Sequence, residues 1–140
     1  MKSSYIINNG LYIIRPMMKQ DVFSYLNLFR YDEKTKNRYY KMYKDVLDNQ
    51  KEDASDLFFV VLKNGKIIGE VGTRSLADSP CDATVTIVLP QNIADREEVE
   101  QLFIKLCLET YLYDDIYILN VEGTKRRKEM ISDSSRRETS

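Results

Sequence analysis

Short apolar runs alternate along the chain with longer segments in which apolar residues recur every three or four positions. Short β-branched runs favour strands, whereas apolar residues at helical spacing indicate amphipathic helices. Residues 11–15 ("LYIIR") end at Pro16 and predict a first strand. Residues 17–30 and 34–49 both have the helical spacing and predict two helices after this strand.

A hairpin is the clearest local signal. Asn64-Gly65 separates the apolar runs 57–62 and 67–74. This dipeptide is preferred in two-residue hairpin turns because both central residues take positive φ. The second run contains Gly69 and Gly72, and glycine inside a strand often marks a bulge or a close approach of another backbone.

The second half of the chain reads as a strand, a helix and a strand over residues 83–89, 96–113 and 116–121. Such a unit almost always joins parallel strands by a right-handed crossover. The whole pattern therefore predicts an α/β (α+β) fold in the order β-α-α-β-β-β-α-β. We expect a mixed β-sheet flanked by helices.

The composition indicates one ordinary globular domain. The chain has 140 residues, a net charge of −1 and no histidine. The near-neutral charge gives no electrostatic signature of nucleic-acid binding. Without histidine the commonest general base and metal ligand is missing, so we expect no metal site. No apolar run approaches the length of a membrane span, and no signal peptide is apparent. Two cysteines in unlike contexts favour a reducing, cytoplasmic location over a disulfide.

Charge is unevenly distributed at the C-terminal end. Residues 125–140 contain six basic and three acidic residues and few apolar ones. We expect residues 1–124 to form the domain and 125–140 to form a basic polar tail. The tail has two interpretations, a hook for nucleic acid or an acidic partner, and a solvated segment.

The order of elements resembles that of the GNAT superfamily, the acyl-CoA N-acyltransferases. The stretches that carry the resemblance are "LYIIRPMMKQDVFSYLNLF", "LFFVVLKNGKIIGEVGTRSL", "ATVTIVLPQN" and "DIYILNV". The resemblance implies transfer of an acyl group from acetyl-CoA or another acyl-CoA to an amine on a small molecule or peptide. By analogy with the family, the acyl-CoA contacts would come from the strand end and the loop after it: Ile87, Val88, Leu89, Gln91, Ala94 and Arg96.

The loop after this strand departs from the family pattern. That loop normally supplies glycines whose amides hold the pyrophosphate at a helix start, where free N–H groups favour an anion. Here no register gives a glycine. Asp95 and Glu98 have the spacing of a capping box, so the protein's own carboxylates could fill the anion site. Retained acyl-CoA binding through Gln91, Arg96 and backbone amides is the other interpretation.

Glu70 is the candidate catalytic base, since it is a carboxylate within an apolar strand. Burial in the cleft would raise its pKa to a useful range. Strand alternation allows the opposite orientation, toward solvent. Thr84 and Thr86 share one strand face and could line the same cleft. In the family arrangement the acceptor site would be bordered by tyrosines of the second helix, Tyr39, Tyr40 and Tyr43.

The C-terminal part is shortened relative to the family. After Val121 the chain has no tyrosine to protonate the leaving thiolate, and too few β-forming residues for the final strands. A short helix over residues 125–131 is the one element that this segment suggests. The alternative to an enzyme is therefore a catalytically inactive GNAT-fold module that has lost CoA binding. Such a module would bind a partner or form a homodimer through an exposed edge near residues 116–121.

Overall fold

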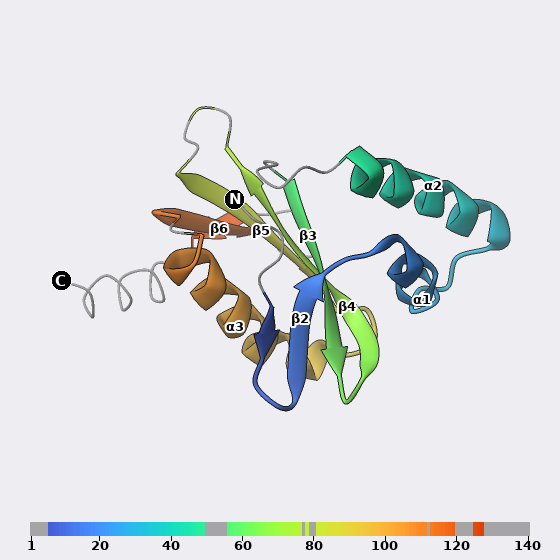
Figure 1. Cartoon of the computed structure of the whole chain (residues 1–140), viewed down its shortest axis with the longest axis horizontal. Coiled ribbons are helices and arrows are strands. Elements are labelled where there is room, and N and C mark those ends of the chain that lie inside the picture. The colour runs from blue at the N-terminus through green and yellow to red at the C-terminus, as the bar shows by residue number, and fades with distance from the viewer. Residues whose placement is uncertain are drawn as a thin grey trace.

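The computed structural model describes residues 6–49, 56–76, 78, 81–111, 113–119 and 125–127, which form a seven-stranded sheet between helices (Figure 1). The strand order in the sheet follows the chain order. Every neighbouring pair is antiparallel except β5 and β6, which are parallel. The strands are β1 (Ile7–Asn8), β2 (Tyr12–Pro16), β3 (Asp56–Lys63), β4 (Lys66–Ser75), β5 (Asp82–Val88), β6 (Asp115–Leu119) and β7 (Lys125–Arg127). The expected mixed sheet and its parallel crossover unit are confirmed.

The helices agree with the predicted pattern in number and order. A 3-10 turn η1 (Lys19–Asp21) leads into the short helix α1 (Val22–Leu26), and α2 (Glu33–Asn49) follows. A second 3-10 turn η2 (Ile93–Asp95) leads into α3 (Arg96–Glu109). The first helix is shorter than expected. Past Leu26 the backbone amides of Leu28 and Phe29 donate to carbonyl oxygens three residues earlier, as in 3-10 turns, and not four residues earlier as in an α-helix. None of the described helices is long and apolar enough to cross a membrane.

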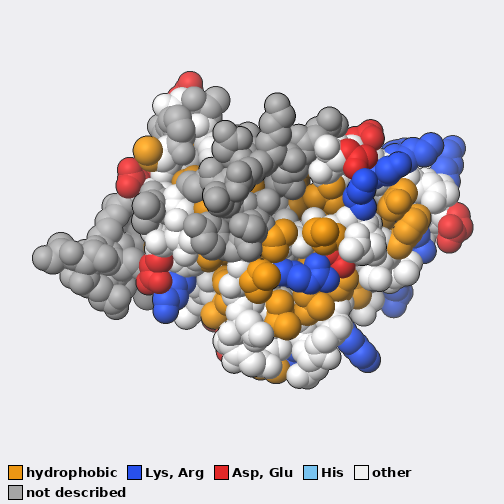
Figure 2. All heavy atoms as spheres, in the orientation of Figure 1, with side chains coloured by type: hydrophobic (Ala, Val, Ile, Leu, Met, Phe, Trp, Pro, Cys, Tyr) orange, Lys and Arg blue, Asp and Glu red, His pale blue; other side chains and the backbone are white. Residues whose placement is uncertain are grey.

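The two faces of the sheet bury separate apolar clusters. One cluster packs α3 against the sheet, with Phe103, Ile104 and Cys107 fully buried over Phe59. The other packs α1 and α2 against the opposite face, around Val60. Figure 1 shows α1 and α2 at one end of the sheet, and Figure 2 shows Lys and Arg side chains gathered over α2. The helices α1 and α2 therefore lie toward one end of that face. A cavity lined by residues of β3, β4 and β5 is also present in the structure.

The hairpin between β3 and β4 has the predicted turn. Asn64 has φ 51° and Gly65 has φ 80°, so both central residues take the left-handed conformation. The register of β3 and β4 shifts between Val61 and Leu62. Just after the shift, Gly69 lies so close to β5 that a Cβ atom on it would be 2.1 Å from the carbonyl oxygen of Val88. The expected close backbone approach is confirmed at this glycine.

The strand β7 corrects two expectations about the C-terminal segment. It pairs antiparallel with β6, from Tyr117 with Arg127 to Leu119 with Lys125. Residues 125–127 therefore form a strand. The expected short helix is wrong for these residues, and so is the expectation that the C-terminal segment contains no strand. Strand pairing uses backbone groups, so three basic residues can form it without β-favouring side chains. The expected free edge on β6 is covered at residues 117–119, while 120–124 and 128–140 lie outside the described residues. The domain division at residue 124 stays a prediction.

We expect Gly69→Ala to lower the free energy of unfolding by about 3 kcal/mol, because the added methyl group would overlap the Val88 backbone. Gly72→Ala is the matched control on the same strand. Its Cβ would lie 3.0 Å from the Leu57 carbonyl, so its cost should be smaller, about 1 kcal/mol. Urea unfolding measures both values, and equal losses would contradict the proposed close approach.

Candidate functional site

Glu70 lies in the middle of β4 and is buried, with 8% of its surface exposed. It pairs with Val88 of β5 in the sheet register. The strand that was expected to hold the acyl donor therefore lies directly beside the candidate base. The alternative interpretation, in which this side chain alternates outward to solvent, is wrong.

Two tyrosines hold one oxygen of the Glu70 carboxylate. The hydroxyl groups of Tyr25 on α1 and Tyr43 on α2 both donate to Oε1, at 2.8 and 2.6 Å. The other oxygen, Oε2, is buried and has no hydrogen-bond partner. Burial raises the pKa of Glu70, and the two tyrosine hydrogen bonds oppose that rise in part. The result is a carboxyl group that is held in place and whose pKa is raised from its ordinary value by burial.

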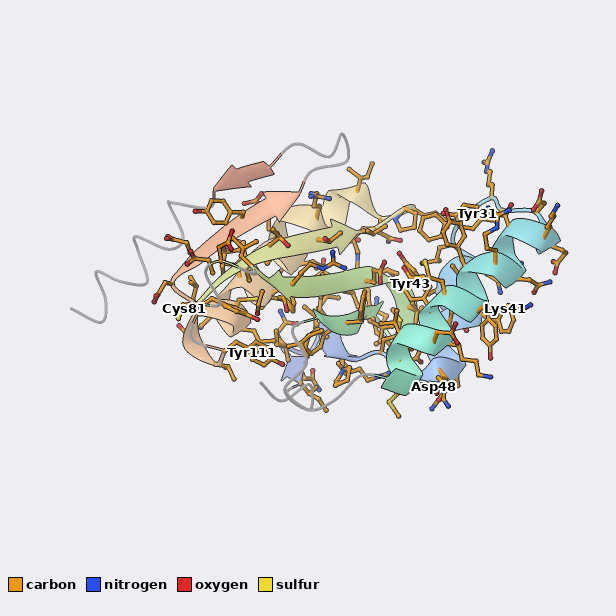
Figure 3. The ribbon with its side chains drawn as sticks, turned by 90° about the horizontal axis from the view of Figure 1, so that it is seen from above. Tyr31, Lys41, Tyr43, Asp48, Cys81 and Tyr111 are labelled. Atoms are coloured by element: carbon orange, nitrogen blue, oxygen red, sulfur yellow. The ribbon has the colours of Figure 1, made fainter. Side chains whose placement is uncertain are left out.

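Glu70 borders two cavities on the side of the sheet that carries α1 and α2. The first, the aromatic cavity, has a volume of about 200 Å³. Figure 3 shows Tyr43 projecting from α2 toward the sheet and Tyr31 near the start of that helix. The lining residues are Tyr25, Leu26, Phe29, Tyr31, Tyr39, Tyr43, Glu70 and Val88.

The second cavity, the threonine cavity, has a volume of about 270 Å³ and lies over β3, β4 and β5. Its lining residues are Phe58, Glu70, Gly72, Thr73, Arg74, Thr84 and Thr86. The β4–β5 register pairs Gly72 with Thr86 and Arg74 with Thr84, which explains why alternate residues of both strands meet here. The expectation that the two threonines share a face and line a cleft is confirmed.

The junction of β5 and α3 differs from the expected self-capped helix start. Asp95 stands at the N-cap position, but its side chain makes no cap hydrogen bond. Its carboxylate instead accepts hydrogen bonds from the Tyr12 hydroxyl, from Lys63 Nζ at 2.9 Å and from Asn92 Nδ2 at 3.2 Å. The Tyr12 hydrogen bond, followed by that of Lys63, lowers the pKa of Asp95. The capping-box expectation for Asp95 is wrong because these partners on β2 and β3 hold the carboxylate against the sheet.

The predicted pyrophosphate residues lie together at this junction, but their side chains make other contacts. Arg96 Nη1 donates to the carbonyl oxygen of Ile87 at 3.0 Å, and Gln91 Nε2 donates to the carbonyl oxygen of Leu28 at 2.7 Å. Ile87 lies one residue beyond Thr86, the last residue of β5 that pairs with β6. Arg96 thus satisfies a backbone acceptor on the part of β5 that was expected to face the acyl donor.

An acyl-CoA at the start of α3 would need one rearrangement of the residues present. Neither η2 nor α3 has a side-chain cap, but the backbone amides of Asp95 and Arg96 already donate to the carbonyl oxygens of Asn92 and Ile93, so an anion at this junction would bind the remaining amides. Ala94 lies within η2. Contact of a pantetheine arm with the Ile87 carbonyl would require the Arg96 side chain to leave it, and the freed guanidinium would then lie near the helix start. Among the described residues, no cluster of three or more His, Cys, Asp or Glu side chains could hold a metal ion.

Sequence reasoning found Glu70 but missed most of its surroundings. Helical spacing predicts Tyr25 only as an apolar position within residues 17–30, and no motif marks Arg74 or Phe58 as site residues. The period-two alternation of β4 was the available signal, since it places Glu70, Gly72 and Arg74 on one face. Of the helix tyrosines expected near the acceptor, Tyr39 and Tyr43 line the aromatic cavity. Tyr40 does not line it and stacks on Phe23, with ring centroids 4.2 Å apart.

Solved acetyltransferase structures resemble the chain. A chimera of the Vibrio cholerae spermidine N-acetyltransferase SpeG and hSSAT matches at 15% identity with a TM-score of 0.62, over 81% of this chain and 73% of that chain. The ribosomal-protein-S5-alanine acetyltransferase of Vibrio fischeri gives the same identity, TM-score and coverage. A GCN5-related N-acetyltransferase from Brucella melitensis matches at 15% identity with a TM-score of 0.59, over 81% of this chain and 59% of that chain.

No protein-family model and no curated protein sequence matches the chain, so its likeness to known proteins rests on structure. At these identities the structural matches show the fold. The chain has the GNAT fold, and the sequence resemblance is confirmed at that level.

We expect Glu70→Gln to stabilise the protein increasingly as pH rises. The raised pKa of Glu70 in the folded state means that its protonated form is favoured there. The glutamate's contribution to stability is therefore fully present below the unfolded pKa, about 4.3, and is lost as pH rises through the higher folded pKa. Urea unfolding over a pH series measures the difference between variant and wild type. Glu97→Gln, at an exposed position of α3, is the control for the same change at the surface. A Glu70→Gln advantage that shrinks with rising pH would contradict the burial argument.

Proposed function

We propose that the protein is an acyl-CoA-dependent N-acyltransferase in which Glu70 is the general base. The observation that carries the proposal is the position of this carboxylate. It is buried, it borders both cavities, and it pairs in the sheet with Val88, on the strand end expected to hold the acyl donor. A base needs to lie within hydrogen-bonding reach of the amine that it deprotonates, and the two cavities provide space for that amine.

The proposed reaction starts with an acceptor amine in its ammonium form. Glu70 takes one proton and leaves a neutral amine, whose nitrogen lone pair forms a bond to the thioester carbonyl carbon. The carbon–sulfur bond then breaks, the nitrogen loses a second proton, and the thiolate of CoA gains one. The products are an amide, CoA and the proton that Glu70 releases to solvent. Tyr25 and Tyr43 keep the carboxylate oriented through Oε1 during these steps.

The proposed donor site uses the junction of β5 and α3. The pyrophosphate would bind the uncapped amides at η2 and the start of α3, where the helix dipole favours an anion. Arg96 would leave the Ile87 carbonyl and add a positive charge to the same site. The pantetheine arm would then run along residues 87–89, with Gln91 and Ala94 at the loop that follows.

We expect Glu70→Gln to reduce kcat/KM by about 10²–10⁴-fold, the usual contribution of a general base, with unchanged affinity for CoA. Acetyl transfer from acetyl-CoA to a panel of amines measures the rate, and calorimetry measures CoA binding. Glu109→Gln is the matched control, since Glu109 is exposed and lies at the opposite end of α3 from the proposed donor site. A Glu70→Gln enzyme with the wild-type rate would disprove the assignment of the base.

A second candidate function is that of an inactive GNAT-fold module that has lost CoA binding. The Arg96 contact with Ile87 and the glycine-free loop favour it, because both occupy positions that the donor would need. Such a module would act by binding a partner or by forming a homodimer, and sizing measurements would show the latter.

The two candidates differ in CoA affinity. For the enzyme we expect wild-type protein to bind CoA in the micromolar range, through the helix-start amides and a displaced Arg96. For the inactive module, calorimetry would give no heat at millimolar CoA. The double variant Ala94→Gly and Arg96→Gly would then gain binding, because it frees the Ile87 carbonyl and loosens the loop. Measurable acetyl transfer by the wild type would eliminate the inactive module.

A further inference from the structure

We propose that the aromatic cavity binds the acceptor as a cation, and that the acceptor is a primary ammonium group on a slim, unbranched alkyl chain. The inference rests on the proposed function, because it names the class of amine that the same site takes. Three features of the described residues carry it: the buried oxygen of Glu70 that has no hydrogen-bond partner, the arrangement of the rings, and the contrast between the two cavities.

The charge at Glu70 has no counter-ion within the described part of the chain. The tyrosine hydroxyl groups both bind Oε1, and Oε2 has no hydrogen-bond partner. A buried carboxylate is costly unless a cation or further donors compensate it. An ammonium group in the adjacent cavity would supply both a positive charge and up to three N–H donors. An ammonium ligand would therefore compensate the carboxylate and give Oε2 a hydrogen-bond partner together.

The rings around this carboxylate form a continuous aromatic wall. Tyr25 meets Phe29 edge to face, with ring centroids 5.3 Å apart, and Phe29 stacks on Tyr31 at 5.0 Å. Tyr31 in turn lies 4.9 Å from Tyr39, and Tyr43 meets Tyr25 edge to face at 5.9 Å. Aromatic faces carry negative potential and attract ammonium groups, most strongly where water is excluded. Their carbon surfaces also pack well against an alkyl chain.

The two cavities differ in charge, and this assigns the ammonium to one of them. Arg74 lines the threonine cavity, whereas no Lys or Arg is among the residues that line the aromatic cavity. In the aromatic cavity a cation would meet rings, two aliphatic side chains and Glu70, with no like charge among the lining residues. The volume of about 200 Å³ suits a narrow alkyl chain better than a bulky or branched amine.

The test measures binding in the absence of acyl-CoA, with n-butylammonium as the probe and n-butanol as its neutral analogue of similar shape. Calorimetry or tyrosine chemical shifts follow the titration of the whole chain. We expect n-butylammonium to bind at least tenfold more tightly than n-butanol, and Glu70→Gln to abolish that preference. Lowering the pH until Glu70 is protonated should have the same effect.

Neighbouring tyrosines on α2 provide a matched pair of variants. Tyr39 lines the cavity without a hydrogen bond to Glu70, and Tyr40 lies outside the cavity against Phe23. We expect Tyr39→Leu to weaken n-butylammonium binding about three- to tenfold and Tyr40→Leu to leave it unchanged. Equal effects of the two variants would overturn the proposal, and so would equal affinity for the ammonium and the alcohol or full binding by Glu70→Gln. Thermal unfolding of each variant checks that it is folded.

Failure of this inference is distinguishable from failure of the proposed function. Tight, Glu70-dependent n-butylammonium binding without any acetyl transfer would keep the cation site and reject the enzyme. Acetyl transfer to amines without a preference for n-butylammonium over n-butanol would keep the enzyme and reject the cation site.

Discussion

The burial of one carboxylate organises the side of the sheet that carries the candidate site. Glu70 Oε1 accepts hydrogen bonds from α1 and α2 at once, so a single oxygen joins both helices to β4. The cost of placing a carboxylate among apolar side chains is offset only if both tyrosines stay in position. The walls of the aromatic cavity are thus fixed by the same hydrogen bonds that hold the carboxylate in place. Structure and proposed chemistry depend on one set of hydrogen bonds.

A second buried carboxylate, that of Asp95, lies at the start of α3, beside the candidate donor site. Asp95 ties the start of α3 to Tyr12 on β2 and Lys63 on β3. Because this side chain is held against the sheet, it does not cap the helix that it begins. Glu97 and Glu98 still lie in the first turn of α3, so the acidic character that the sequence indicates remains at the helix start although Asp95 does not cap it. The Arg96 side chain lies on the Ile87 carbonyl, at the strand end where the proposed acyl donor would bind.

The features that could be predicted from sequence are those that local chemistry determines. Asn64-Gly65 specifies its turn by its own backbone preferences, and the helical spacing of α2 needs no knowledge of its neighbours. The partners of Glu70 lie 27 and 45 residues away, and Tyr12 is 83 residues from Asp95. Such pairings depend on how the strands align, which no periodicity reveals. The strands β1 and β7 have only two and three residues, too few to show an alternating pattern. Each forms because its backbone pairs with a neighbouring strand, which the sequence does not reveal.

The strand order has a consequence for the way in which the chain folds. Each strand of the sheet is bonded to the strands just before and after it in sequence, so a sheet can grow from the N-terminal end one strand at a time. During synthesis, every new strand would find its partner edge already formed. The two slower steps are the joining of β2 to β3 across both helices and the parallel joining of β6 to β5 across α3, since both close long loops. Glu70 belongs to the hairpin between these steps, and its partner Tyr43 emerges before it. The part of the sheet that carries Glu70 would therefore be assembled on the ribosome ahead of the crossover that joins β6 to β5.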